Sequence, residues 1–600
     1  MSRRPLAVAA GAATAALAAT AFTIPATATP PSDQASGSAA AQKSDDRADA
    51  LEAERRDLTQ KATELVVSGE REVQDRGGSK AVRVAPGQWA QYGQQASDNV
   101  LTFLVEFSDQ QDPRFPTAPA GPQHNEIPAP DRSRDNSTYW TDDFDRQHFL
   151  DMMFADEGES FKNVYEELSS GRYTVGGDVS DWVQVPNNEA SYGETESHTD
   201  MTRFVDDSAE AWFEQQQAAG KTDAEIKAYL ADFDTWDRFD YDGDGDFKES
   251  DGYIDHFQAV HAGEDESAGA PSWAIWAHRW AVNQDGRYAD GAGPAQYGED
   301  ALNGGVEIGD TGFWIRDYTT EPENGGLGVF AHEYAHDLGL PDLYDTSGGE
   351  NGTGFWTLMS SGSWLGHGDG AIGTTPNHMG AWEKLQLGWL DYEMAKTGTE
   401  STHELGPSYH ASKKAQAVIV ELPKDAQGKS RYYIAENRQY LGYDKTLQQG
   451  PYNFGWGVTQ PDRVEHFPYQ DGLSINYWNT AYARNTVNRH PGAGLVLPVD
   501  AHPAALRWSD GTVARNRIQT YDATFGVQAT DPLSLHRETA TGMTTLGVDS
   551  KPAVRMFDDS DPDAYYDPAN PLGSVRVAGT GTTIRVVQSN RNGIMTIEVQ

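Results

Sequence analysis

Runs of apolar residues alternate with amphipathic stretches over the first two thirds of the chain. Residues 100–107 form an apolar, β-rich run that closes at Ser108-Asp109, which predicts a buried strand. Residues 144–168 have helical spacing, and a long acidic helix is expected over residues 208–230. The combination of predicted strands and helices indicates an α+β unit, which we place at residues 98–392.

After about residue 391 the pattern changes to short strands separated by Gly, Pro, Asn and Asp. The expected strands cover residues 417–422, 432–435, 494–499, 573–577, 583–587 and 595–599. Short strands separated by turn-forming residues favour a β-sandwich-like fold. We therefore expect a β-rich C-terminal domain at residues 393–600.

The N-terminus has the layout of an export signal. A basic start with Arg3 and Arg4 precedes an Ala-rich apolar run at residues 6–24, and Ala26-Thr27-Ala28 fits a cleavage site. We expect a signal peptide at residues 1–28 and a secreted, extracellular protein. The two arginines are too weak a signal to choose between export routes. No other apolar stretch reaches spanning length, so stable membrane association is not expected.

Residues 29–97 are rich in Ala, Ser and charged residues and have little core of their own. Leu51, Leu58 and Leu65 are spaced by heptads, which predicts one amphipathic helix at residues 48–67. A segment of this kind after a signal peptide is typical of a propeptide, although its composition fits a disordered linker equally well.

Charge and cysteine content exclude several classes of function. Lys plus Arg number 46 and Asp plus Glu number 91, so the net charge is 46 − 91 = −45. This charge argues against nucleic-acid binding and against docking on anionic lipid. There is no cysteine, which excludes disulfides, thiol nucleophiles and thiolate metal ligands. Any metal must be bound by His, Asp, Glu or backbone oxygen.

The strongest chemical motif is His-Glu-Tyr-Ala-His at residues 332–336. On a helix, His332 and His336 lie on one face and can bind one zinc ion. Glu333 can then act as the general base for a water molecule, as HExxH motifs do in metallopeptidases.

The third zinc ligand follows a turn. Gly339 allows the helix to end, and Asp342 lies where an extended motif supplies another ligand. Glu383 is the alternative, by analogy with peptidases that use a distant Glu. Met359, among Ser and Gly residues, fits the methionine turn beneath the metal of metzincin-type peptidases.

A second, calcium-type motif precedes the zinc motif. Asp240, Asp242 and Asp244 occupy positions 1, 3 and 5 of an EF-hand-like loop, with Asp246 at position 7 and Asp251 at position 12. Position 12 usually holds Glu, so the match is incomplete, and a solvated acidic turn is the alternative. We expect a structural Ca²⁺ here.

Taken together, the run from His332 to Asp345 and the Trp-x-x-Met-x-x-Gly-Ser-Trp stretch resemble the immune inhibitor A family of secreted metallopeptidases. Further similar stretches are VEFSD at 105–109, DGYIDHF at 251–257, HAGED at 261–265, WAHRW at 276–280, WEKLQLGWL at 382–390, AENRQ at 435–439, NRHPGAG at 488–494 and RIQTYDATFG at 517–526. The resemblance implies a zincin-type catalytic domain and an extracellular zinc endopeptidase that has a propeptide and is stabilised by calcium.

We therefore expect a zinc metalloendopeptidase whose partners are protein or peptide substrates. The alternative is a secreted, non-catalytic binding protein with a structural metal site. Without cysteine, latency cannot come from a thiolate on the metal, so a propeptide carboxylate or steric cover of the cleft is the hypothesis. The sequence assigns no substrate, no oligomeric state and no residue that stabilises the oxyanion.

Overall fold

The computed structural model describes residues 44–600, except 48, 94–95, 134, 136, 284–292, 295–302, 369–370, 454, 456–463 and 591–592. The expected signal peptide at residues 1–28 lies outside the described residues. None of the helices in the described part of the chain combines the length and the apolar character needed to cross a bilayer.

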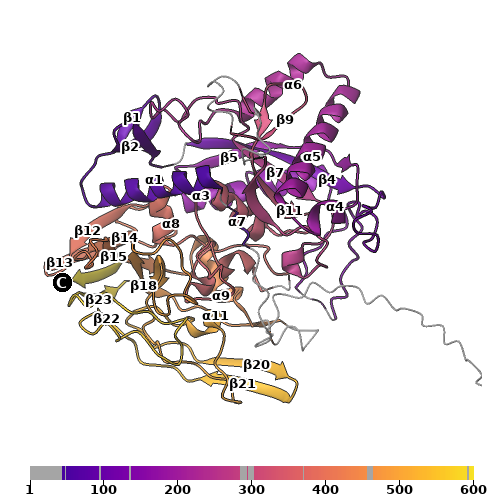
Figure 1. Cartoon of the computed structure of the whole chain (residues 1–600). Helices are drawn as coiled ribbons and strands as arrows, with labels where there is room; N and C mark the ends of the chain where they lie inside the picture. Colours follow the sequence, from indigo (N-terminus) through magenta and orange to yellow (C-terminus); the bar gives the residue numbers. More distant parts are fainter. Residues whose placement is uncertain are drawn as a thin grey trace, which may run out of the picture.

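A mixed sheet forms the centre of the N-terminal two thirds (Figure 1). Its strand order is β5-β4-β7-β11-β8, and β6 also pairs with β4. Every pairing is parallel except that of β8 with β11, so β8 is an antiparallel strand at one end of this order. The strands are β4 Ser97–Phe107, β5 Thr174–Val179, β6 Val183–Val185, β7 His256–His261, β8 His278–Ala281 and β11 Asp317–Pro322.

The predicted strand at residues 100–107 is confirmed as part of β4, which shows how the sheet is buried on both faces. Phe103 and Val105 pack with helices α5 and α6, whereas Val100 and Leu104 pack with α2, α3 and α7. Alternate residues of a strand face opposite sides, so one apolar run can serve two cores.

Two expected helices are each broken into two. Residues 144–168 form α2 (Arg146–Phe154) and α3 (Phe161–Leu168), because the Ser160 hydroxyl accepts a hydrogen bond from the Asn163 N–H and starts a new helix. The acidic helix begins earlier than expected, as α5 (His198–Ala218). The chain turns at Gly220, whose φ is 87°, and α6 (Asp223–Leu230) follows.

The segment at residues 29–97 has more structure than its composition suggests. The expected helix is confirmed as α1 (Ala50–Val67). It packs on a three-stranded sheet of β1 (Gln74–Arg76), β2 (Ser79–Ala85) and β3 (Gln88–Gln91) through a small buried cluster. The expectation of one helix without a core is therefore wrong for the described residues. α1 also contacts the short helix α8 (Ala381–Gln386), which lies more than 300 residues later in the chain (Figure 1).

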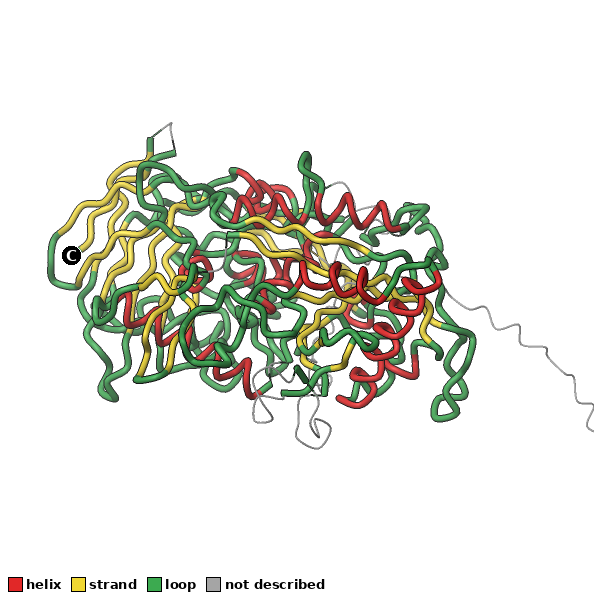
Figure 2. The backbone as a smooth tube through the Cα atoms, turned by 90° about the horizontal axis from the view of Figure 1, so that it is seen from above, coloured by secondary structure: helices red, strands yellow, loops and turns green. Residues whose placement is uncertain are grey.

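The C-terminal third holds most of its strands in two sheets, which lie at the strand-rich end of the molecule in Figure 2. The orders are β12-β14-β15-β18-β19 and β13-β24-β23-β22, and both sheets contribute to one hydrophobic cluster. The strands are β12 Tyr392–Lys396, β13 Ser401–Leu405, β14 Ala417–Glu421, β15 Arg431–Arg438, β18 Gly472–Asn479, β19 Val496–Pro498, β22 Met556–Asp558, β23 Thr583–Ser589 and β24 Met595–Val599.

The mixed helix-and-sheet class is confirmed, while the β-sandwich-like description of residues 393–600 stays a prediction. The expected strand at residues 573–577 is wrong. Val575 and Val577 are buried, but their N–H groups bond to the carbonyls of Tyr565 and Pro562 in a loop instead of a neighbouring strand.

Short elements connect these layers. They include α4 Ala190–Gly193, β9 Val306–Glu307, β10 Trp314–Ile315, α9 Thr446–Gln449, β16 Tyr452–Asn453, β17 Glu465–His466, α11 Asn516–Gln519 and the hairpin β20 Leu533–Thr539 with β21 Gly542–Val548. One large hydrophobic cluster runs from α2, α3 and α7 into β14, β15 and β18, so the two parts of the chain share a core.

Candidate metal centre

The HExxH motif lies on α7 (Leu327–Asp337), a helix whose residues are almost all buried. The helix approaches the turn at residues 361–364 closely at Gly328, where an added Cβ would lie 1.9 Å from the Ser363 carbonyl oxygen. It ends as the sequence predicts. Gly339 has φ of 109°, and the Leu340 N–H returns to the Ala335 carbonyl at 3.0 Å.

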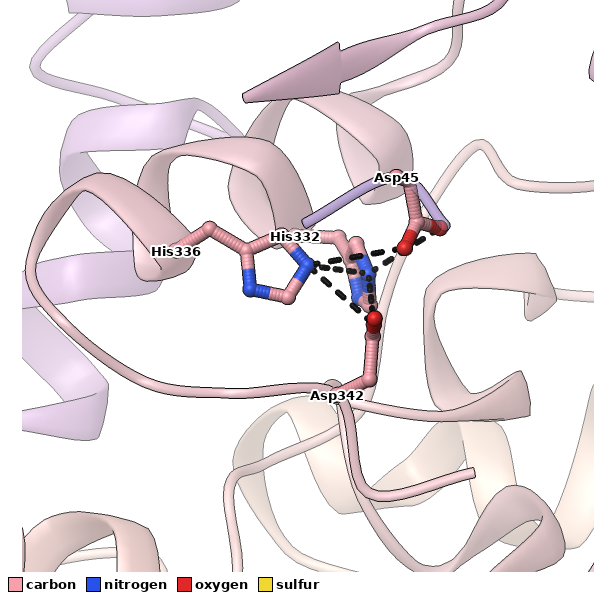
Figure 3. A group of neighbouring side chains, drawn as sticks. All are labelled: Asp45, His332, His336 and Asp342. Carbon is pink, nitrogen blue, oxygen red and sulfur yellow. Dashed lines mark hydrogen bonds and ion pairs between the residues drawn. The ribbon is translucent and has the colours of Figure 1, made fainter. Parts of the chain in front are cut away.

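The two motif histidines face one another across one turn of α7, and their Nε2 atoms are 3.1 Å apart (Figure 3). Each Nδ1 contacts a backbone carbonyl, that of Leu358 at 2.8 Å for His332 and that of Leu340 at 2.7 Å for His336. A carbonyl can only accept a hydrogen bond, so each Nδ1 carries the proton and each Nε2 keeps its lone pair for a metal.

The methionine turn supports this arrangement. Met359 is fully buried, and its carbonyl accepts a hydrogen bond of 2.9 Å from the Leu343 N–H. Leu358, the residue before it, supplies the carbonyl that orients His332. Through these two hydrogen bonds, the turn contacts both His332 and the segment after the motif.

Asp342, not Glu383, joins the two histidines. Its Oδ1 lies 3.5 Å from Nε2 of His332 and 3.2 Å from Nε2 of His336, and neither of its buried oxygens has a hydrogen-bond partner. Glu383 instead accepts hydrogen bonds from the Thr357 hydroxyl and from the backbone N–H that precedes α8. Burial opposes ionisation of Asp342, but the adjacent histidines outweigh it and hold its pKa below the ordinary value.

A fourth group, Asp45, comes from the propeptide-like segment (Figure 3). Its carboxylate oxygens lie 3.7 Å from Nε2 of His332 and 3.8 Å from Nε2 of His336. Tyr344, two residues after Asp342, donates a hydrogen bond to this carboxylate. The sequence offered no signal for Asp45. Tyr344 could have been suspected from its place in the motif.

The segment around Asp45 pairs with β8 through backbone hydrogen bonds. The Arg279 N–H donates to the Asp45 carbonyl at 2.8 Å, and the Arg47 N–H donates to the Arg279 carbonyl at 2.9 Å. This is a parallel bridge to β8. The neighbouring Asp46 is bound by the Arg56 guanidinium of α1 at 2.5 Å. The segment thus covers the β8 edge of the sheet.

Glu333 lies beside the metal-ligand candidates. Its side chain is buried, and its Oε2 has no hydrogen-bond partner. Burial raises its pKa well above the ordinary value, and the Asp45 carboxylate adds to the effect. A carboxylate in this position, with an unused oxygen, is suited to accept a proton.

An ionic network fixes the end of α7. The Arg238 guanidinium binds both oxygens of Asp337 at 2.6 and 3.0 Å, and Nδ1 of His256 lies 2.5 Å from the same carboxylate. Burial opposes the charged form of His256, but the carboxylates of Asp337 and Asp98 outweigh burial and raise its pKa to about 9.

The donor set fits zinc. Two imidazole nitrogens and two carboxylates each offer one ligand atom within 4.8 Å of the others, and three of the four residues are buried. Zinc prefers nitrogen and carboxylate ligands in this number, and catalytic sites use three protein ligands and one exchangeable position. The unpartnered oxygens of Asp342 are the observation that supports a cation at this site.

The acidic loop is only partly assembled. The structure brings together the carboxylates of Asp240, Asp242 and Asp244, whereas Asp246 and Asp251 lie outside this group. The Asp251 N–H instead donates to Asp234, and Asp251 is buried. The loop is followed by β7, not by a helix, so a complete EF-hand is absent from the described residues.

Comparison with known proteins gives a consistent result. Residues 87–390 match the catalytic domain of the immune inhibitor A peptidase M6 family, and residues 426–598 match the VEG domain of immune inhibitor A-like metallopeptidases. Immune inhibitor A of Bacillus thuringiensis subsp. alesti is 32% identical over 378 residues, which are 58% of this chain and 50% of that protein.

The pre-pro-metalloprotease PrtV of Vibrio cholerae serotype O1 (strain M66-2) is also 32% identical, over 325 residues. These are 50% of this chain and 31% of the Vibrio protein. The chain therefore spans half of the length of the first relative and less of the second.

Proposed function

Because this chain belongs to the immune inhibitor A peptidase M6 family, we propose that it is a secreted zinc endopeptidase that hydrolyses extracellular proteins. The observation that carries the proposal is the buried group of His332, His336 and Asp342 with Glu333 beside it. Both relatives are named as an immune inhibitor or a metalloprotease, which supports the activity.

We assign His332, His336 and Asp342 as the residues that hold zinc, with Asp342 in place of the His that metzincins more often use. When bound, zinc supplies Lewis-acid chemistry, in which it polarises a carbonyl group and makes water a better nucleophile at neutral pH. The two Nδ1–carbonyl hydrogen bonds keep both imidazoles in the tautomer that this chemistry needs.

Glu333 acts as the general base and then as the acid. Its unpartnered oxygen accepts the proton of the attacking water, and the protonated carboxyl later donates it to the leaving amine. Its buried, weakly solvated position raises its proton affinity, which suits both steps.

Tyr344 stabilises the negative charge that forms on the carbonyl oxygen. Its hydroxyl already donates a hydrogen bond to a carboxylate oxygen of Asp45, close to both motif histidines. Once Asp45 has left, the same donor faces the position of the reacting carbonyl. Tyr344 thus supplies the oxyanion group that the sequence could not identify.

Asp45 keeps the precursor latent. Its carboxylate occupies the space beside the zinc ligands, and residues 45–47 cover the edge of β8 to which an extended substrate could add. This supports the hypothesis of a propeptide carboxylate, combined with steric cover. The Vibrio relative is named as a pre-pro-metalloprotease, which is consistent with a leader and a propeptide.

Calcium bound by Asp240, Asp242 and Asp244 stabilises the mature fold in this proposal. The three carboxylates are exposed or half-buried and offer the oxygen ligands that calcium prefers. Arg76 of β1 donates to the Asp244 carbonyl, so the loop also contacts the propeptide-like segment. Calcium should therefore affect stability more than the chemical step.

Casein hydrolysis by protein purified from the medium tests the proposal, before and after zinc chelation and after zinc is added back. We expect loss and recovery of activity, with no effect of serine-directed inhibitors. Zinc-loaded protein freed of residues 29–97 that hydrolyses nothing would instead favour the non-catalytic binding protein.

A further inference from the structure

A second group of His and Asp residues lies in the C-terminal third. Asp500 and His502 follow β19, and Asp522 follows α11, so two segments of the chain meet here. One ligand atom from each of the three residues lies within 4.8 Å of the others. This group is separate from the candidate zinc ligands and takes no part in the proposed chemistry.

The two carboxylates are almost completely buried, with exposed fractions of 1% for Asp500 and 0% for Asp522. Oδ2 of Asp500, Oδ1 of Asp522 and Nε2 of His502 have no hydrogen-bond partner. Unsatisfied polar atoms of this kind are rare in folded proteins and are costly unless another group binds them.

The backbone holds the three side chains in a fixed arrangement. The His502 N–H donates to Oδ1 of Asp500 at 2.7 Å, and Nδ1 of His502 lies 2.9 Å from the Asp522 carbonyl oxygen. The Ala501 N–H donates to the Ala523 carbonyl at 3.0 Å. The group is therefore organised before any ligand arrives.

The charges do not balance. Among the described residues, the one Lys or Arg side chain that forms an ion pair with these two carboxylates is Lys551, 2.9 Å from Oδ2 of Asp522, so one positive charge faces two carboxylates. An additional cation would remove this mismatch.

We propose that Asp500, His502 and Asp522 form a second metal site, which binds a divalent cation that accepts nitrogen and oxygen ligands. One imidazole and two carboxylates favour zinc or manganese over calcium, which takes oxygen ligands only. The site has a structural role. Because its ligands come from two segments, the cation fastens the loop after β19 to the segment after α11.

The test uses the full chain with both His332→Gln and His336→Gln, so that the catalytic centre does not compete. The stripped protein is mixed with ZnCl₂ or MnCl₂ at pH 7.5, passed through a desalting column and analysed for metal. We expect about one equivalent of cation to be retained and His502→Gln to lower the affinity at least tenfold.

Two matched controls accompany this measurement. The exposed His410, changed to Gln, should leave the retained equivalent unchanged. Asp242→Asn in the acidic loop should do the same, because that loop offers no nitrogen ligand. If either control variant no longer retained the one equivalent of metal, the cation would bind at the mutated site instead, and the proposal would be wrong.

The isosteric variant Asp500→Asn provides a second test in case His502→Gln does not fold. In the same background, zinc should raise the melting temperature of the parent but not of the Asn variant. If the parent retains no cation, or if Asp500→Asn raises stability while cation retention is unchanged, the two carboxyls share a proton instead and the proposal is wrong.

Discussion

The two groups of His and Asp residues differ in how the chain assembles them. At the candidate metal centre, His332, His336 and Asp342 come from one helix and the turn after it, whereas Asp45 is distant in the sequence. In the second group, Asp500 and His502 come from the loop after β19, whereas Asp522 comes from the segment after α11. A site built on one helix can be recognised from spacing, whereas a site built between segments cannot.

Their surroundings differ as well. The catalytic helix is buried on most sides and is anchored at its end by Arg238, Asp337 and His256. In the described part of the chain, the second group forms an ion pair with one lysine, Lys551, and with no arginine. The first arrangement is therefore supported by side chains outside the ligand set, whereas the second is held mainly by backbone hydrogen bonds of its own two segments.

The largest effect should come from Glu333→Gln. The variant loses the proton acceptor but keeps the ligand set, so we expect kcat to fall about 10³- to 10⁴-fold with one zinc still bound. Hydrolysis of casein by the processed enzyme and metal analysis of the same sample measure both quantities. Activity within tenfold of the wild type would remove Glu333 from the mechanism.

Tyr344→Phe should have the next largest effect. Removing one oxyanion donor costs about 10²-fold in kcat, and KM should change little because the hydroxyl acts mainly in the transition state. Tyr409→Phe, in the loop between β13 and β14, is the matched control. A change confined to KM would assign Tyr344 to substrate binding instead.

Asp45→Ala should activate the precursor. Without the carboxylate at the centre, we expect the unprocessed chain to hydrolyse a short peptide at least ~10 times faster than the wild-type precursor. Asp57→Ala, an exposed residue of α1, should leave the precursor latent. If both variants stay equally silent, cover by residues 44–91 is sufficient and the carboxylate is dispensable.

The periodicity and motifs of the sequence predicted the strands and helices around the candidate metal centre. They did not predict site residues that depend on contacts between distant parts of the chain. The buried run of β4 and the helix with His332 and His336 follow from local patterns. Asp45 lies 299 residues before the Tyr344 that binds it, and no local spacing records such a contact. The same limit explains why the cluster around Asp522 was missed, although its segment was noticed as part of a family-like stretch.

The smallest effect concerns the anchor of the catalytic helix. The folded pKa of His256 is raised to about 9 from an ordinary value near 6.5, so its protonated form stabilises the fold. This stabilisation is complete below about pH 6.5 and is lost as the pH rises to about 9, with a total of about 3 kcal/mol. The melting temperature of the wild type should therefore exceed that of His256→Gln by a few °C at pH 6. The difference should shrink by pH 9.5. A constant difference across this range would mean that His256 supports the helix through packing and not through its charge.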